Sequence, residues 1–369
     1  MKETNRKYFY GIDFLRWVAA FGVVMYHYSL HFKINEIDYN SFLNYLVINK
    51  EFAPKFVWLF WSISGFVFAN IYLSQKISMK KFFIARFARL YPLHFCTLLI
   101  VAVLQIFSLI LFNRTQENYN NDLYHFILHL LFASDWGLQK DWSFNTPVWS
   151  VSIEIPIYFL FFITLIYLRK YKFLFPILII LFFYYVCPFI IDIFKAQNII
   201  ELNKWQNLAI FNFSTCIFYF FLGVFLFVFL NKYSLFNKYL FLLSLPLILM
   251  SILLLNSNNE NLIFIKKIYP STVVLFSSLI IFFATIDQIF SKFFKLIISF
   301  SNTSYSIYLL HFPIQLIFLI IFEIYLVDLE IFKNFIIFLI FVIILQIISL
   351  ISFKFFEQPF RKYINKNLN

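Results

Sequence analysis

Apolar stretches about as long as a lipid bilayer is thick recur along almost the whole of this 369-residue chain. A hydrocarbon core of about 30 Å is crossed by roughly 20 apolar residues in a helix. Hydrophobic residues make up 62% of the chain and charged residues only 13%, a balance that excludes a water-soluble domain of this size. The sequence therefore predicts an all-α, polytopic transmembrane bundle of about ten spans. The predicted spans are residues 10–31, 54–74, 91–112, 148–168, 173–194, 208–230, 239–255, 270–290, 298–325 and 334–353.

A shorter apolar segment, residues 123–134, lies in the longest loop, which runs over residues 113–147. This segment is too short to span a bilayer, so we expect an interfacial or re-entrant helix there. We expect residues 1–369 to form a single transmembrane domain with no appended soluble domain.

The distribution of Lys and Arg predicts the orientation of the bundle. With the N-terminus inside, the inside segments hold 19 of the 30 basic residues, the outside segments hold 10, and Arg16 lies within a span. Both termini are therefore expected on the cytoplasmic side. The net charge of +12 is spread over many loops instead of forming one basic face, so we expect no nucleic-acid partner.

The first span, GIDFLRWVAAFGVVMYHYSLHF, carries Arg16 and His27 in an otherwise largely apolar helix. Eleven residues make almost three helical turns, so the two side chains share one face and lie roughly 16 Å apart along the axis. A charged residue at the membrane centre costs about 2.5 to 3.5 kcal/mol, so Arg16 needs a partner or a polar cavity. The alternative is that Arg16 snorkels to the inner headgroups while His27 lies at the outer interface.

Two further segments place polar groups at the ends of spans. In RFARLYP, residues 86–92, Arg86 and Arg89 share a helical face, and their planar guanidinium groups suit phosphate oxygens. An ordinary positive-inside anchor is the alternative. In WSVSIE, Glu154 lies about 9 Å into the membrane, where a carboxylate pairs with a cation or stays protonated. Trp149 of this segment could be an interfacial aromatic residue, and both a functional and a structural pairing of Glu154 stay open.

His311 lies near the middle of the ninth predicted span, in NTSYSIYLLHFP, and is followed by Pro313, which predicts a helix irregularity. A satisfied packing histidine is the alternative. His125 and His129 have the i, i+4 spacing of metal ligands, but no third ligand accompanies them, so we assign no metal. The chain has no glycine-rich nucleotide motif and no obvious inverted repeat of the kind that marks many transporters.

Taken together, these motifs resemble the acyltransferase-3 family of bacterial integral-membrane O-acyltransferases, over nearly the whole chain. The family implies a multi-pass protein of the bacterial cytoplasmic (inner) membrane. It also implies transfer of an acyl group, commonly acetyl from acetyl-CoA or another acyl-CoA, to a sugar hydroxyl of a cell-surface or exported glycan. The matching motifs are R-x10-H at Arg16 and His27, SGF at 64–66, R-x-x-R-L-Y-P at 86–92, W-S-x-S-x-E at 149–154, S-Y-x-x-Y-L-x-H-x-P at 304–313 and E-x-P-F-R at 357–361.

This chain departs from the family in two ways. Many members carry a second acidic residue after the Glu of W-S-x-S-x-E, whereas here Ile155 and Pro156 follow. A mechanism that needs a carboxylate pair at that point is therefore in doubt. Some members also carry an SGNH-type domain outside the membrane, and here we expect the transmembrane part to act alone or with a separate partner.

We hypothesise that Arg86 and Arg89 hold the phosphates of acyl-CoA and that Arg16 positions the donor or stabilises developing negative charge. His27 would be the general base or a transient acyl carrier. Glu154 would orient or charge-balance His27. Further candidate site residues are Ser152, Trp149, Tyr305 and His311.

Two alternatives stay open. One is a transporter or flippase of a lipid-linked sugar with Arg16, Glu154 and His311 along its path. The other is an acyltransferase acting on a peptide or on a small molecule that is not a glycan. The sequence leaves the acceptor sugar, the acyl length and the oligomeric state open.

Overall fold

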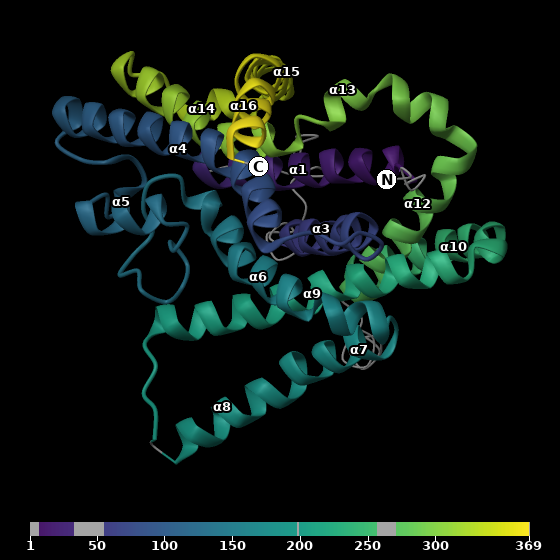
Figure 1. Cartoon of the computed structure of the whole chain (residues 1–369). Helices are drawn as coiled ribbons and strands as arrows, with labels where there is room; N and C mark the ends of the chain where they lie inside the picture. The colour runs from purple at the N-terminus through teal and green to yellow at the C-terminus, as the bar shows by residue number, and fades with distance from the viewer. Residues whose placement is uncertain (1–6, 33–54, 198, 257–270, 369) are drawn as a thin grey trace.

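The computed structural model describes residues 7–32, 55–197, 199–256 and 271–368, and these residues form helices and connecting turns without a β-strand (Figure 1). The long segments reflect the apolar runs of the sequence, because a helix satisfies every backbone N–H and C=O within the segment itself. The principal helices are α1 Tyr10–His31, α3 Lys55–Tyr72, α4 Met79–Phe112, α5 Leu123–Leu130, α6 Trp149–Lys170, α7 Leu174–Leu181, α8 Cys187–Ala196, α9 Lys204–Lys232, α10 Asn237–Asn256, α12 Ser271–Leu296, α13 Ile298–Ser301, α14 Ser304–Ile324, α15 Phe335–Ser352 and α16 Gln358–Leu368.

The predicted all-α membrane bundle is confirmed. Among the described residues, eight helical segments are long and apolar enough to cross a membrane, and α12, bent between Asp287 and Ile289, makes a ninth. Helix α1 coincides with the first predicted span but falls outside that set, and it carries the polar side chains Asp13, Arg16 and His27. The location of the two termini on the cytoplasmic side remains an expectation.

Several boundaries differ from those predicted. The third span begins at Met79 rather than at residue 91, so the segment RFARLYP lies inside α4 and Pro92 is accommodated within it. The fifth predicted span is α7 and α8 joined by a π-helical turn, Phe182–Val186, and a similar turn joins α15 to α16. Helix α5 is the predicted short helix of the long loop and has eight residues.

Helices α3 and α9 approach each other most closely at two glycines. A Cβ atom on Gly65 would lie 1.8 Å from the carbonyl oxygen of Phe220, and one on Gly223 would lie 1.8 Å from that of Ser62. Real side chains cannot occupy such positions, so glycine at both points is what lets the two backbones touch.

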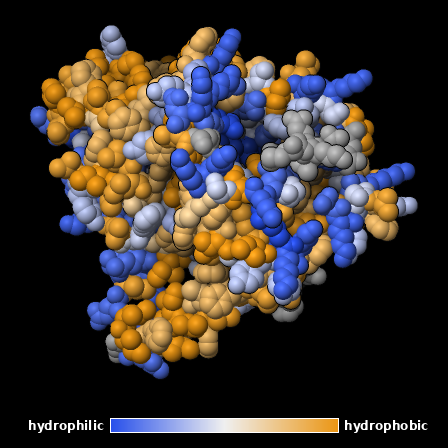
Figure 2. All heavy atoms as spheres, viewed as in Figure 1, coloured by the Kyte–Doolittle hydropathy of each residue, from blue (hydrophilic) through white to orange (hydrophobic). Residues whose placement is uncertain are grey.

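Helix α1 lies inside the bundle, in contact with α3, α12 and α14, while α14 also packs against α4 and α15. The first and ninth predicted spans are therefore neighbours although they are far apart in the sequence (Figure 1). Figure 2 shows that apolar residues cover most of the visible surface and that hydrophilic residues gather over the C-terminal helix α16. This arrangement brings the polar residues of α1, α4, α6 and α14 together in the interior.

Candidate active site

Four arginines and three carboxylates line a cavity made of two connected chambers, which we call the arginine cavity. The larger chamber has a volume of about 320 Å³ and the smaller about 80 Å³. Arg16, Val67, Arg86, Arg89 and Tyr305 line both chambers. The larger chamber adds the charged residues Asp13, Glu357 and Arg361, and the smaller one adds Glu154 and the polar residues Ser64, Ser150, Tyr158, Ser304 and Tyr308.

Arg16 has the ion-pair partner and the polar cavity that its place in an apolar helix requires. Its Nη1 lies 3.1 Å from Oδ1 of Asp13, one turn earlier in α1. The Tyr8 hydroxyl also donates to the Asp13 carboxylate. Because Asp13 balances the charge, the guanidinium of Arg16 can face the cavity without an isolated cation in the membrane.

Arg86 and Arg89, to which the sequence analysis gave one role, have different surroundings. Arg86 is buried, its Nη2 donates to the Tyr72 hydroxyl at 3.0 Å, and its guanidinium carbon lies 4.8 Å from the centre of the Phe68 ring. Arg89 reaches the cavity without a hydrogen bond or ion pair to any described residue. Of the two, Arg89 is therefore the guanidinium that is free to bind an anionic ligand.

Helix α6 presents Ser150, Glu154 and Tyr158 to the cavity, because residues four apart lie on one helical face. The Glu154 carboxyl lies against the Ser64 and Tyr158 side chains. Its shielded Oε1 accepts no hydrogen bond within the described part of the chain. No contact joins Glu154 to His27 among the described residues, so Glu154 belongs to the arginine cavity.

The sequence candidates Ser152 and Trp149 lie beside the cavity rather than in it. Ser152 Oγ donates to the carbonyl oxygen of Trp149 at 3.0 Å and accepts from the backbone N–H of Asp135 at 3.1 Å. The Trp149 ring packs edge-on against Trp61, which lines the smaller chamber. Ser150, which the sequence analysis missed, is the serine of this segment that faces the cavity, with its Oγ 2.6 Å from the Tyr308 hydroxyl.

His27 lies against His311 of α14, and the two imidazole rings are stacked. Nδ1 of His27 is 2.7 Å from Nε2 of His311, and the ring centres are 4.9 Å apart. Tyr308, one helical turn before His311, lines the smaller chamber, and its ring centre lies 6.0 Å from that of His311. The imidazole pair is therefore one turn of α14 away from the arginine cavity.

The hydrogen bonds of this pair determine which nitrogen of His27 is available. Nδ1 of His311 lies 3.3 Å from the carbonyl oxygen of Ile307, which can only accept, so in the neutral ring the proton is on Nδ1. Nε2 of His311 is then an acceptor, and Nδ1–H of His27 donates to it. This tautomer leaves a lone pair on Nε2 of His27, which has no partner among the described residues.

One turn further along α1, His31 extends the line of imidazoles toward the loop after α4. Its ring centre is 5.8 Å from that of His27, and its Nδ1 lies 3.0 Å from Oε1 of Glu117.

Glu117 has a positive φ of 63°, a left-handed conformation that a non-glycine residue rarely adopts. Hydrogen bonds between Gln116 and the side chains of Gln105, Ser108 and Glu323 hold this turn in place. The sequence analysis missed His31 and Glu117, although the i, i+4 spacing of His27 and His31 was visible.

The loop between α5 and α6 closes over α9 through a buried carboxyl group. Asp135 accepts hydrogen bonds from Asn212 Nδ2 at 2.6 Å and from Gln139 Nε2 at 2.7 Å. Burial raises the pKa of Asp135 to about 7. This residue therefore titrates near neutral pH while it holds the loop in place.

The two histidines of α5 contact residues next to α5 and in the loop between α5 and α6. His125 Nδ1 lies 2.7 Å from Asp122 Oδ1, and His129 Nε2 lies 3.2 Å from Ser143 Oγ. Within the described ranges, no group of three or more His, Cys, Asp or Glu side chains is placed to hold a metal ion.

Comparison with known proteins gives one family over most of the chain. The model of the family described as an acyltransferase domain matches residues 9–354. The acyltransferase MdmB of Streptomyces mycarofaciens is 32% identical over 149 residues, which are 40% of this chain and 36% of that protein. The peptidoglycan O-acetyltransferase OatA of Listeria monocytogenes is 28% identical over 176 residues, which are 43% of this chain and 25% of that protein. The chain thus matches about a third and a quarter of these relatives' lengths, and no solved structure gives a significant match.

Proposed function

We propose that this chain, which belongs to the acyltransferase family matching residues 9–354, is a multi-pass membrane enzyme that transfers an acyl group to a hydroxyl of a cell-surface or exported glycan. Acetyl from acetyl-CoA is the proposed donor group, and a bacterial inner membrane is the proposed location. The observation that carries the proposal is an arginine-lined cavity one helical turn from an imidazole pair, the buried His311 and the half-buried His27, with a free ring nitrogen on His27. The printed name of the Listeria relative, a peptidoglycan O-acetyltransferase, supports acetyl as the acyl group and a glycan as the acceptor.

The arginine cavity suits the donor. Acetyl-CoA is a polyanion that supplies an acyl group activated as a thioester. Arg89 and, in the larger chamber, Arg361 can bind its phosphates as charge-assisted hydrogen-bond donors. Arg16 lines both chambers, so its guanidinium can stabilise the negative charge that develops on the thioester carbonyl oxygen during attack.

His27 is the proposed general base. Its Nε2 lone pair takes the proton of the acceptor hydroxyl, and the hydroxyl oxygen attacks the carbonyl carbon of the donor. The carbon–sulfur bond then breaks, and the proton held on His27 leaves with the sulfur as a thiol. His311 holds His27 in the tautomer that this step needs, which makes His311 a positioning residue.

We propose that the proton exchanges with solvent past His31 and Glu117, which are in contact without hydrogen-bond geometry. The Glu117 side chain is 27% exposed, whereas that of His31 is 2% exposed, so the two residues lie between the half-buried imidazole of His27 and the surface. In the expected orientation this surface is the outer one. A donor bound from inside and an acceptor bound from outside would then meet between Arg16 and His27.

Incubating the purified protein with labelled acetyl-CoA and the glycan of its source, followed by mass spectrometry of the products, tests this proposal. We expect an acetyl ester on the glycan and release of free CoA. Movement of a lipid-linked sugar across the membrane of proteoliposomes without any covalent product would instead support the transporter alternative. An ester on a peptide or a small molecule would support the acyl transfer but contradict the glycan as its acceptor.

A further inference from the structure

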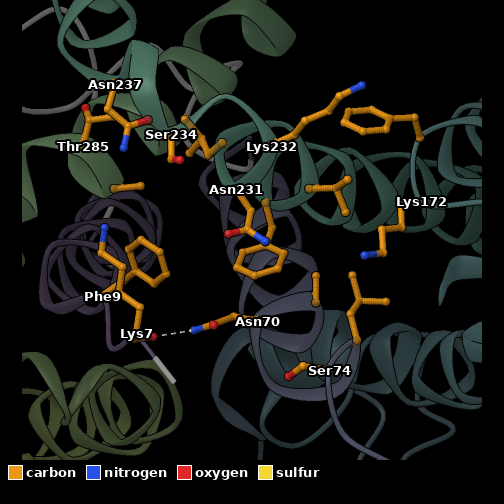
Figure 3. A pocket seen from close by; sticks show the side chains of 17 residues that line it. Lys7, Phe9, Asn70, Ser74, Lys172, Asn231, Lys232, Ser234, Asn237 and Thr285 are labelled. Atoms are coloured by element: carbon orange, nitrogen blue, oxygen red, sulfur yellow. Dashed lines mark hydrogen bonds between the residues drawn. The ribbon is translucent and has the colours of Figure 1, made fainter. Parts of the chain in front are cut away.

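A second, larger cavity of about 750 Å³ lies among the ends of α3, α6 and α9 and the beginning of α10 (Figure 3). Its lining also includes the segment before α1 and one turn of α12. None of its residues was singled out from the sequence, and apart from Phe9 and Asn70, which also line the arginine cavity, none belongs to the proposed donor site. We call it the lysine cavity after the three lysines that line it, Lys7, Lys172 and Lys232.

Lysines are the only charged residues that line this cavity, and Asp287, which does not line it, lies close enough to Lys7 to attract its ammonium group. No Asp or Glu lines it, and none of the three lysines has a carboxylate within ion-pair distance in the described part of the chain. The Nζ of Lys7 lies 4.9 Å from the centre of the Phe9 ring, and that of Lys232 lies 4.6 Å from the Phe173 ring. Contact with an aromatic face leaves the N–H groups of an ammonium free to bind an anion.

Uncharged hydrogen-bond donors accompany the lysines. Figure 3 shows the Asn231 side chain in the middle of the cavity, with Lys7 on one side and Lys172 on the other. Asn237, Ser74 and Ser234 add amide and hydroxyl groups around them. Amide and hydroxyl donors next to several ammonium groups make a set that matches the oxygen atoms of a phosphate. The remaining wall is apolar and includes Phe173, Phe227, Val228 and Leu230.

The lysine cavity is separate from the arginine cavity. Phe9 and Asn70 line both cavities, and the Asn70 side chain donates to the backbone carbonyl of Lys7 at 3.1 Å. The Phe9 ring packs edge-on against Phe66 at 5.2 Å. Residues 7–9, just before α1, are thereby held between the two cavities as a wall.

We propose that the lysine cavity is a second binding site, one that takes a phosphate group attached to an apolar or aromatic body. Lysines near the ends of spans also serve to orient a membrane protein, but that role needs no cavity and no inward-facing amides. A volume of 750 Å³ is that of a small-molecule site, and its mixed wall suits a ligand with an anionic head. Such a phosphate can come from an anionic lipid headgroup or from the nucleotide part of a CoA molecule.

Binding measurements on intact protein, without turnover, test the site independently of the proposed catalysis. One arm uses native mass spectrometry of the protein released from nanodiscs of phosphatidylglycerol and phosphatidylcholine. The other arm uses equilibrium dialysis with radiolabelled adenosine 3′,5′-bisphosphate. The test variant is Asn231→Asp, which places a negative charge in the cavity at nearly constant shape. The matched control is Asn367→Asp, the same change on the exposed face of α16.

We expect Asn231→Asp to weaken one of the two probes by at least about tenfold while Asn367→Asp leaves it unchanged. Loss of phosphatidylglycerol identifies a headgroup site, and loss of the bisphosphate identifies a nucleotide site. The double variant Lys172→Gln/Lys232→Gln should reproduce the loss, and Lys80→Gln/Lys292→Gln, which removes equal charge outside the cavity, should not. The proposal is overturned if neither probe binds the wild type, or if Asn231→Asp and Asn367→Asp bind both probes equally.

Discussion

The hydrogen bond from His27 to His311 determines which atom of the half-buried His27 imidazole can react. A neutral histidine has one donor and one acceptor nitrogen, and the partner of one nitrogen sets the role of the other. In this protein the chain of bonds runs from the Ile307 carbonyl through His311 to Nδ1 of His27. The proposed chemistry therefore depends on a neighbour that does not itself touch the substrate.

Replacing His311 tests that dependence. We expect His311→Ala to lower kcat by about 10- to 100-fold, as the loss of an orienting partner does elsewhere, with little change in KM for the donor. His311→Gln should retain much more activity, because the glutamine amide oxygen can replace Nε2 of His311 as the acceptor for the Nδ1–H of His27. Steady-state kinetics over a range of pH measure both effects. Equal losses in the two variants would show that position 311 has only a packing role.

At this scale the sequence predicted part of the site. The helical period predicted that Arg16 and His27 share one face of α1, and in the structure Arg16 lies in a chamber lined by Tyr305 and Tyr308 of α14 while His27 contacts His311 of the same helix. The sequence analysis assigned Glu154 to His27, whereas Glu154 lines the chamber of Arg16. The pairing of His27 with His311 could not be read from the sequence, because it depends on the packing of two helices that brings together residues 284 positions apart. Ser150 and Ser152 were equivalent in the motif, and only the packing of α6 shows which one faces the cavity.

At the scale of helices, the contact of α3 with α9 is the closest in the bundle at which glycine is required. We expect Gly65→Ala to destabilise the protein by about 1 to 3 kcal/mol or more, because the new methyl group would overlap the backbone of Phe220. Thermal unfolding in detergent, followed by tryptophan fluorescence, measures the change. Gly22→Ala is the comparison, since the atoms nearest to its new methyl belong to the side chain of Phe56, which must shift, and not to a backbone. Similar unfolding temperatures for the two variants would contradict this interpretation.

The loop that Asp135 holds against α9 should respond to pH. The pKa of Asp135 is raised by burial from an ordinary 3.8 to about 7, so between these values the folded protein binds a proton that the unfolded chain has released. Stability should therefore fall as pH rises from about 4 to about 7, and the loss should then level off. The contribution is on the order of a few kcal/mol.

Comparing the wild type with Asp135→Asn isolates this group from the others that titrate. We expect the difference in unfolding temperature between the two proteins to change across that pH window and to be constant above it. Thermal scans at several pH values make the measurement. Parallel curves for the two proteins would show that the Asp135 carboxyl does not titrate in this range.

The sequence predicted the helices better than their ends. Apolar length alone located each of the eight spanning helices among the described residues, because a bilayer requires about 20 apolar residues per crossing. The start of α4 at Met79 was missed, because the charged stretch that contains Arg86 and Arg89 reads as a loop although it continues the helix. The π-helical turns at Phe182–Val186 and Phe353–Glu357 leave no composition signal.

At the scale of the whole molecule, the described interior contains two cavities and one imidazole pair. The arginine cavity and the imidazole pair adjoin each other along α14, and the lysine cavity lies beyond the wall formed by the segment before α1. In the expected orientation, both cationic cavities lie toward the cytoplasm and His31 and Glu117 lead outward. Under the proposed function, a polyanionic donor and a neutral hydroxyl acceptor would then approach the reacting groups from opposite sides.

The central claim is that Arg89 binds the donor and His27 activates the acceptor, and acetyl-transfer kinetics of Arg89→Gln and His27→Gln test it most directly. We expect His27→Gln to lower kcat by about 10²- to 10⁴-fold with an unchanged KM for acetyl-CoA. Arg89→Gln should instead raise that KM by about tenfold and change kcat little. Wild-type kcat in His27→Gln, or an unchanged donor KM in Arg89→Gln, would contradict the account.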